Sequence, residues 1–350
     1  MSPNDVPAPQ PTIATEVVLP GVVEPSGLEI RRRALPPPRK GQALVRVEAS
    51  GVSFAEQAMR RDRYPGQPAF PFVPGYDLVG TVTAAGAGVD PTLIGARVAA
   101  MTKTGGWASH ALLAAEDLVP VPAGLDPAAV ETLVVNGLTA WQMLHRKATV
   151  QRGQAIVVHG ANGGVGTTLV QLAVDAGVRV LGTASPRHHQ ALEDLGAEPI
   201  DYDDPDLAGR VRALAPRGVD AVFDHIGGPT LDASYAMLGP RGTLVSYAIA
   251  SMPETGSMYA IFARHIARLY RYNLLPGGRT GTFYDVWGGH LTRPARFRRR
   301  LREDLGHVLA LLEGGVLTAQ IAARVPLVRA AEAMELAESR TAFGKVVLVG

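Results

Sequence analysis

The chain has 350 residues, a length that suggests about two domains. It is 47% hydrophobic and 19% charged, as expected of a well-packed soluble protein, and its formal net charge of +2 argues against electrostatic binding to nucleic acid. It contains no cysteine, which excludes disulfides, thiolate zinc sites and cysteine nucleophiles, and it shows neither a signal peptide nor an apolar stretch of about 20 residues. We therefore expect a cytoplasmic protein without a membrane span.

The first third of the chain reads as β structure. Residues 1–14 are polar and rich in proline, so we expect a disordered leader. From residue 15, short alternating or apolar segments are separated by Gly and Pro, which predicts a compact, barrel-like β-rich domain. The expected strands are 16–19, 28–31, 42–49, 78–83, 96–100, 107–113 and 118–121.

The pattern changes at Asp126-Pro127, which reads as an N-cap followed by proline in the first helical turn. Two helices are predicted next, at 127–134 and about 137–147. Strands and helices then alternate, which predicts a doubly wound parallel sheet. The expected strands are 156–158, 178–183, 199–202, 219–224, 243–247 and 282–286, and the expected helices are 188–195, 206–215, 230–237 and 258–272.

The last 60 residues predict a helix at about 297–313, a strand near 321–322, a helix at 329–337 and a strand at 345–349. A terminal β-α-β piece has no sheet of its own to join, so we expect it to return to the first domain.

One stretch combines a strand, a glycine turn and a helix. The apolar run 156–158 is followed at once by Asn162, Gly163, Gly164, Val165 and Gly166, and then by apolar residues at helical spacing. Glycines let backbone N–H groups come close to a pyrophosphate, and the new helix points its positive end at the anion. Placed between a strand and a helix, this turn predicts a dinucleotide site, although alanine occupies the first glycine position of the usual pattern.

Four segments resemble the medium-chain dehydrogenase/reductase family, in particular its zinc-independent quinone oxidoreductase group, which is related to enoyl reductases. They are 49–65, 71–80, 136–140 with the glycine turn, and 344–348. The resemblance covers residues 15 to 350. It implies an α/β fold in which a Rossmann domain of residues 132–288 is inserted in a β-rich, GroES-like catalytic domain of residues 15–131 plus 289–350.

The resemblance extends to zinc enzymes, so a metal site has to be weighed. Zinc-containing members place a cysteine near Ser53 and a His-Glu pair where this chain has Tyr76-Asp77. Serine, tyrosine and an isolated aspartate are poor zinc donors, and the nine histidines are scattered. We therefore expect no metal site.

The end of the predicted second strand bears on the choice of cofactor. NAD-binding sheets commonly place a carboxylate there to hold the ribose 2′-OH, whereas this strand is followed by Ser185 and Arg187. A hydroxyl and a guanidinium suit a 2′-phosphate, which favours NADPH. The resemblance puts Tyr202 near the same phosphate, although packing at a strand end explains this tyrosine equally well.

Further cofactor contacts are expected at the ligand edge of the sheet. Ile226 and Gly227 follow the fourth strand, and Ser246 and Tyr247 follow the fifth, where an open α/β sheet binds its ligand. Simple turn chemistry would explain Gly227 as well. The resemblance adds Thr139, near the nicotinamide, and Lys345 in the closing segment, and these residues complete the predicted set.

Hydride transfer to a conjugated acceptor is the predicted chemistry, because an enone or quinone spreads the incoming charge and needs only a hydrogen-bond or proton donor. Two tyrosines are candidate donors. Tyr64 resembles a tyrosine of polyketide enoyl reductases, and Tyr76 stands where zinc enzymes have histidine. A cleft-lining aromatic is the alternative interpretation of Tyr64, and solvent can supply the proton.

The sequence thus predicts NADPH-dependent reduction of a quinone or of the activated C=C bond of an α,β-unsaturated carbonyl. Two alternatives stay open: an accessory enoyl reductase of a biosynthetic pathway, and a non-catalytic NADPH-binding regulatory protein. Ser53 and Glu56 replace the Asn and Asp frequent in the group, which leaves room for the latter. The expected partners are a small-molecule electrophile and a second copy, paired through 282–286. The arginines between 293 and 302 read as a solvated helix start.

Overall fold

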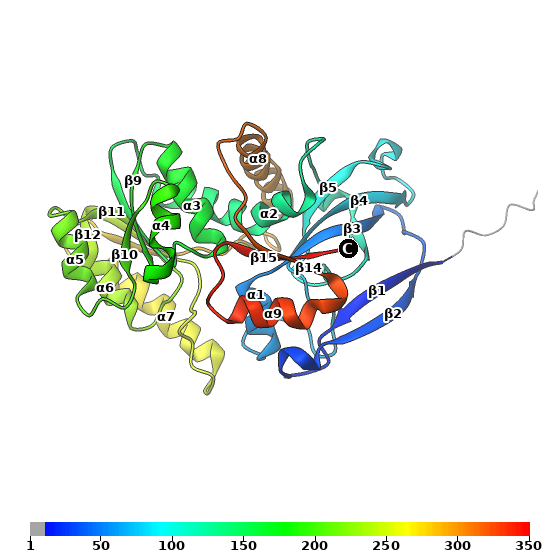
Figure 1. The fold of residues 1–350 in the computed structure, drawn as a ribbon, viewed down its shortest axis with the longest axis horizontal. Helices are drawn as coiled ribbons and strands as arrows, with labels where there is room; N and C mark the ends of the chain where they lie inside the picture. The colour runs from blue at the N-terminus through cyan, green and yellow to red at the C-terminus, as the bar shows by residue number, and fades with distance from the viewer. Residues whose placement is uncertain (1–10) are drawn as a thin grey trace, which may run out of the picture.

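Two large sheets organise the chain, and the computed structural model describes residues 11–350 of it (Figure 1). A six-stranded parallel sheet lies at one end of the molecule, and a seven-stranded sheet with mostly antiparallel pairs lies at the other. None of the helices in this described part is long and apolar enough to cross a membrane.

The parallel sheet has the strand order β10-β9-β8-β11-β12-β13. Counted from β8, this is the order 3-2-1-4-5-6 of a doubly wound dinucleotide-binding sheet, so the predicted sheet is confirmed. Its strands are β8 (Ala155–His159), β9 (Arg179–Ala184), β10 (Glu198–Asp201), β11 (Val219–Asp224), β12 (Leu238–Ser246) and β13 (Thr280–Phe283).

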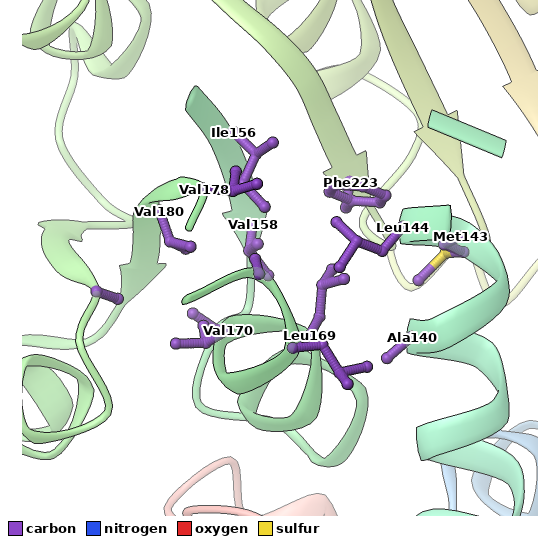
Figure 2. Close-up of a cluster of buried hydrophobic side chains, with 14 of the residues drawn as sticks. Ala140, Met143, Leu144, Ile156, Val158, Leu169, Val170, Val178, Val180 and Phe223 are labelled. Carbon is purple, nitrogen blue, oxygen red and sulfur yellow. The ribbon is translucent and has the colours of Figure 1, made fainter. Parts of the chain in front are cut away.

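Helices cover both faces of this sheet because its central strand is apolar on both sides. Ile156 and Val158 of β8 pack against Leu169 and Val170 on one face (Figure 2), whereas Val157 packs in a separate cluster on the other. The covering helices are α3 (Gly164–Asp175), α4 (His189–Asp194), α5 (Leu207–Leu214), α6 (Thr230–Met237) and α7 (Met258–Tyr272).

The second sheet follows the order β14-β15-β3-β4-β5-β7, with β6 paired to β3. The last strand pairs antiparallel with β3, which confirms that the tail returns to the first domain. The strands are β3 (Gln42–Val52), β4 (Asp77–Ala85), β5 (Arg97–Met101), β6 (His110–Ala114), β7 (Val119–Pro120), β14 (Ile321–Pro326) and β15 (Lys345–Val349).

The remaining elements surround this sheet or join it to the parallel one. A two-stranded sheet pairs β1 (Thr12–Val18) with β2 (Glu29–Leu35). The α-helices are α1 (Phe54–Arg60), α2 (Pro127–Trp141), α8 (Pro294–Glu313) and α9 (Ala330–Glu338). Single 3-10 turns are η1 (Pro25–Gly27), η2 (Pro91–Leu93), η3 (Ala115–Asp117), η5 (Pro186–His188) and η6 (Leu327–Arg329).

One prediction about local structure is wrong, and one helix was missed. The two helices predicted around Gly137 are one, because α2 runs through this glycine and continues into the π-helical segment η4 (Gln142–Ala148). Gly137 is kept helical by packing: a Cβ there would meet Val308 of α8 at 2.8 Å. Helix α1 was not predicted from the sequence.

The predicted leader is also shorter than expected. Residues 1–10 lie outside the described part of the chain, so that portion of the prediction stays untested. Residues 12–14 contradict it, because Thr12 pairs with Leu35 and Ala14 pairs with Arg33 across β1 and β2. Ala14 is fully buried, so this stretch is part of the folded structure.

Candidate functional site

The glycine turn between β8 and α3 forms the first part of the site. A side chain on Gly166 would overlap the carbonyl oxygen of Gly160, and one on Gly164 would overlap the amide of Asn136. Only glycine therefore lets the helix begin this close to the strand. The first N–H groups of α3 have no partner within the helix, so Gly164, Val165 and Gly166 offer backbone donors and a positive helix end to an anion.

The segment before β15 braces this turn from the other sheet. The Asn162 side-chain amide donates to the carbonyl of Ala342 at 3.3 Å, and the Gly344 N–H donates to the carbonyl of Asn162 at 2.8 Å. Gly163 also pairs with Gly344 in an isolated parallel bridge. The side chain of Asn162 is thus used to hold the turn, which leaves the backbone of the turn as its ligand-binding surface.

The structure brings together Ser185, Arg187 and Tyr202 at the carboxyl ends of β9 and β10. The Tyr202 N–H donates to the carbonyl of Ala184 at 3.1 Å, which places this tyrosine beside Ser185. Tyr202 is 56% exposed, so it does not pack as a buried strand-end residue. The exposed Arg187 guanidinium donates to the carbonyl of Arg340 at 3.2 Å, a contact 153 residues away that no local signal predicts.

A buried carboxylate organises the loop after β11. Asp224 is fully buried, and its Oδ1 accepts from the N–H groups of Ile226 at 2.8 Å and Gly227 at 2.9 Å. Burial alone would raise the pKa of Asp224, but His159 and the hydrogen bonds from Gly227 and Ser234 outweigh it and lower the pKa. The N–H groups of Ile226 and Gly227 are therefore already bonded within the loop, and the predicted cofactor contact of these two residues stays a prediction.

Two predicted cofactor residues, Ser246 and Tyr247, lie at the end of β12. The Ser246 hydroxyl is buried 2.9 Å from His265 Nε2 of α7, and the predicted position of Ser246 beside the cofactor stays a prediction. Tyr247 is half-buried, with its ring 5.9 Å from that of His225. Sequence reasoning missed His225, whose signal is its position directly after β11.

Thr139 lies where the two sheets meet. It is 6% exposed within α2, one turn before Gln142, whose side chain accepts from the phenol of Tyr284 at 3.0 Å. Tyr284 follows β13, and its N–H donates to the carbonyl of Ser246 at 2.8 Å. Thr139 is thus close to the carboxyl ends of β12 and β13, the edge at which such sheets bind ligands.

Lys345 is not available to a cofactor, contrary to the prediction. Its Nζ lies 2.8 Å from Glu131 Oε1 and 3.1 Å from Asp77 Oδ2, and all three side chains are buried. Burial alone would lower the pKa of Lys345, but the two carboxylates outweigh it and raise the pKa. This ion triad joins β15 to α2 and β4, so its role is structural.

The two predicted tyrosines form a hydrogen-bonded pair between the sheets. The Tyr64 and Tyr76 hydroxyls lie 2.5 Å apart, and Trp287 Nε1 donates to the Tyr76 oxygen at 2.5 Å. Trp287 follows β13, whereas Tyr76 precedes β4, so the pair lies where the parallel sheet meets the other sheet. Burial raises the pKa of Tyr64 to about 12, against the opposing effect of its bond to Tyr76, and burial also raises the pKa of Tyr76.

Glu56 fixes the backbone that carries Tyr76. Its Oε1 accepts from the Tyr76 N–H at 2.7 Å, and its Oε2 accepts from the Ser53 N–H at 2.9 Å, at the start of α1. Burial and nearby Asp77 raise the pKa of Glu56. Glu56, which departs from the family pattern, therefore holds the backbone of Tyr76 in place.

Arg63 links the phenol pair to the loop after β12. Its guanidinium donates to the carbonyls of Gly256, at 2.9 Å, and of Pro253. Tyr64, next in sequence, is thereby tethered to this loop.

Several polar atoms around these segments are ready for a ligand. In the described part of the chain, six buried side-chain polar atoms lack a hydrogen-bond partner, and three of them are Ser53 Oγ, His188 Nε2 and His225 Nδ1. Such atoms are rare in folded proteins unless a ligand or water satisfies them. Together with the glycine turn, they fit a site for an extended polar ligand such as a dinucleotide.

The same residues do not fit a metal. Within residues 11–350, no group of three or more His, Cys, Asp or Glu side chains could hold an ion. At the position of the zinc ligands in related enzymes, the Tyr76 oxygen is bonded to Trp287 and Tyr64, and the Asp77 carboxylate is bonded to Lys345.

Comparison with known proteins agrees with this architecture. Residues 39–123 match the family model described as an alcohol dehydrogenase GroES-like domain, and residues 195–348 match the one described as a zinc-binding dehydrogenase. The human synaptic vesicle membrane protein VAT-1 homolog is 31% identical over 331 residues, which cover 92% of this chain and 82% of that protein.

Solved structures show the same fold along nearly the whole chain. The mycobacterial protein Rv1454c, complexed with NADPH, has a TM-score of 0.83 at 30% identity, covering 96% of this chain and 100% of that one. Escherichia coli quinone oxidoreductase, complexed with NADPH, has a TM-score of 0.83 at 25% identity with the same coverage. The predicted fold, a Rossmann sheet combined with a GroES-like domain, is confirmed, and this chain belongs to the medium-chain dehydrogenase/reductase family, within its quinone oxidoreductase-like group.

Proposed function

We propose that this protein is an NADPH-dependent oxidoreductase that transfers hydride to a quinone or to the activated C=C bond of an α,β-unsaturated carbonyl. The backbone donors of the glycine turn suit the pyrophosphate. Ser185, Arg187 and Tyr202 suit the 2′-phosphate, since no carboxylate follows β9 directly. Similar structures that carry NADPH support this choice of cofactor.

The observation that carries the proposal is the bonded phenol pair. The indole N–H of Trp287 can only donate, so the Tyr76 oxygen accepts it. Tyr76 is 4% exposed, and its own proton needs an acceptor, which the Tyr64 oxygen provides at 2.5 Å. This arrangement satisfies Tyr76 fully and leaves the Tyr64 proton free for a substrate oxygen or carbon.

Such a proton suits a conjugated acceptor. The nicotinamide supplies the hydride when it is bound. An enone that gains hydride at its β-carbon becomes an enolate, and the Tyr64 O–H can stabilise the oxygen and then protonate the enolate. Tyr64 is half-buried, so solvent can return a proton to the resulting phenolate, which meanwhile accepts a hydrogen bond from Tyr76. The residues in the cleft do not fit a metal, so these O–H groups are the donors available to the developing charge.

Replacing Tyr64 by phenylalanine tests this role. We expect kcat for enone reduction to fall by about 10²-fold, because general acid catalysis typically contributes about 10²–10⁴-fold, with the NADPH dissociation constant unchanged. Stopped-flow oxidation of NADPH measures kcat, and fluorescence titration measures the NADPH dissociation constant. Tyr270→Phe is the control, since that ring is 68% exposed on α7. Undiminished turnover in Tyr64→Phe would remove the residue from the mechanism.

A second copy of the chain is part of the proposal. β13 is the last strand of the parallel sheet, so its outer edge is free to pair with a symmetry-related β13. We expect light scattering to give twice the 36.9 kDa mass of the chain. A mass of one chain at micromolar concentration would contradict pairing through this edge.

A further inference from the structure

A cavity of about 620 Å³ lies outside the site described above. It is open to solvent on one side and is bordered by η4, by the segment 284–293 that follows β13, and by the N-terminal half of α8. Neither the glycine turn nor the phenol pair lines it. Its volume is that of a typical small-molecule site.

Two arginines of α8, Arg296 and Arg300, and its N-cap residue Arg293 line one wall of this cavity. Arg293, Arg296 and Arg300 are spaced by three and four residues, so they share one face of the helix. Lys147 of η4 faces the same cavity. In the described part of the chain, none of these four cations lies within 4.0 Å of a carboxylate, although other arginines of this region are paired.

Two neighbouring arginines, in contrast, are paired with carboxylates. Arg146, which also lines the cavity, is bonded to buried Asp304 at 2.5 Å. Arg299, on the same helix, lies 3.8 Å from Glu303 and is 71% exposed. Four of the five Lys and Arg side chains that line the cavity, all except Arg146, are thus left without a carboxylate partner in the described part of the chain.

The helix end adds to the positive potential. α8 has 20 residues, begins at Pro294 and carries no acidic residue in its first turn. Arginines at a helix N-terminus are unfavourable because the helix dipole is positive there. Asp285 is the carboxylate on the cavity wall, and its Oδ1 accepts from the Trp287 backbone N–H at 3.0 Å. The positive charge on this wall exceeds the single negative charge of Asp285, which favours a ligand with two or more negative charges.

Part of the remaining wall is apolar. Leu138, Val286, Phe297 and Leu301 contribute to it, and beneath them the Tyr284 hydroxyl donates to the side chain of Gln142. A free inorganic anion would leave this apolar wall uncovered.

We propose that the cavity binds an organic phosphate, with its phosphate groups on Arg296 and Arg300 and its apolar portion against Phe297 and Val286. Guanidinium groups bind phosphate through paired hydrogen bonds, and two of them on one helix face match a diphosphate. The site is separate from the proposed cofactor site and does not depend on the proposed reaction.

Calorimetric titration of the whole protein tests the proposal, with NADPH present in excess so that the glycine turn is filled. The probes are inorganic pyrophosphate, geranyl diphosphate and citrate. We expect pyrophosphate to bind and geranyl diphosphate to bind at least about fivefold tighter, because its chain covers apolar surface. Citrate should bind at least about tenfold more weakly than pyrophosphate, because its carboxylates do not match both guanidinium groups.

The matched variants are Arg296→Gln combined with Arg300→Gln, and Arg299→Gln as control. The double variant should lose about tenfold or more in affinity for both phosphates, as expected for losing charge-assisted hydrogen bonds, and the control should stay within about twofold. Absence of pyrophosphate binding, equal losses in the double variant and the control, or citrate binding as tight as pyrophosphate would each overturn the proposal.

Discussion

Replacing Lys345 by methionine is expected to lower the free energy of unfolding by about 3–5 kcal/mol, the cost of leaving buried charge unpaired. Lys345 is 3% exposed, and the side chains of Asp77 and Glu131, its two partners, are fully buried. Without the ammonium group the two carboxylates repel each other inside the protein. Urea denaturation measures the loss. Lys40→Met is the control, because Lys40 is exposed and should cost less than about 0.5 kcal/mol.

The pH dependence of this variant separates lost charge from lost packing. Burial and nearby Asp77 already raise the pKa of Glu131. Without Lys345 the folded state binds a proton that the unfolded state releases, so the stability of the variant should rise as pH falls from 8 toward the ordinary glutamate pKa of about 4.3. Adding Glu131→Gln should restore part of the loss at neutral pH. A loss that is equal at every pH would indicate a packing defect and contradict the electrostatic account.

Replacing Arg187 by alanine is expected to weaken NADPH binding by about 10–100-fold, which corresponds to about 1.4–2.8 kcal/mol for losing charge-assisted bonds to the 2′-phosphate. NADH lacks this phosphate, so its dissociation constant should change by less than about threefold. Fluorescence titration with both cofactors measures the difference. The effect should shrink at high salt, because Arg187 is exposed and its charge is screened.

Arg210→Ala is the matched control for this experiment. Arg210 is an exposed arginine of α5, outside the group formed by Ser185, Arg187 and Tyr202. We expect its replacement to leave both dissociation constants unchanged. Equal losses for NADPH and NADH in Arg187→Ala would show that the side chain supports the fold of the loop, and an unchanged NADPH affinity would exclude it from the site.

The sequence was sufficient for elements with strong local signals. α7 has the predicted bounds 258–272, because Ser257 provides an N-cap that accepts from the Ala260 N–H, and the apolar residues follow at helical spacing. The glycine turn could also be predicted from the sequence, because its strand, glycines and helix are consecutive. The break predicted at 135–136 is absent from α2, and this part of the helix packs against α8, far along the chain, where a Cβ on Gly137 would meet Val308 at 2.8 Å.

Most contacts of the site that sequence reasoning missed join distant segments, whereas one is local. Trp287 and Tyr76 are 211 residues apart, so nothing in either segment indicates that the indole bonds to the phenol. Lys345 was assigned to the cofactor by resemblance, whereas its partners Asp77 and Glu131 come from β4 and α2. Ile226 and Gly227 were placed at the correct strand end, but Asp224 occupies their N–H groups.

The proposed reaction requires direct transfer of hydride from NADPH to a conjugated acceptor, and one experiment tests this transfer most directly. The purified protein is incubated with NADPH deuterated at the transferring face of nicotinamide C4, together with 9,10-phenanthrenequinone or an enone such as 2-cyclohexenone, and the products are examined by mass spectrometry and NMR. We predict oxidation of NADPH and deuterium at the β-carbon of the reduced enone. Tight NADPH binding without oxidation by any acceptor, or a reduced enone without deuterium, would contradict the proposed reaction.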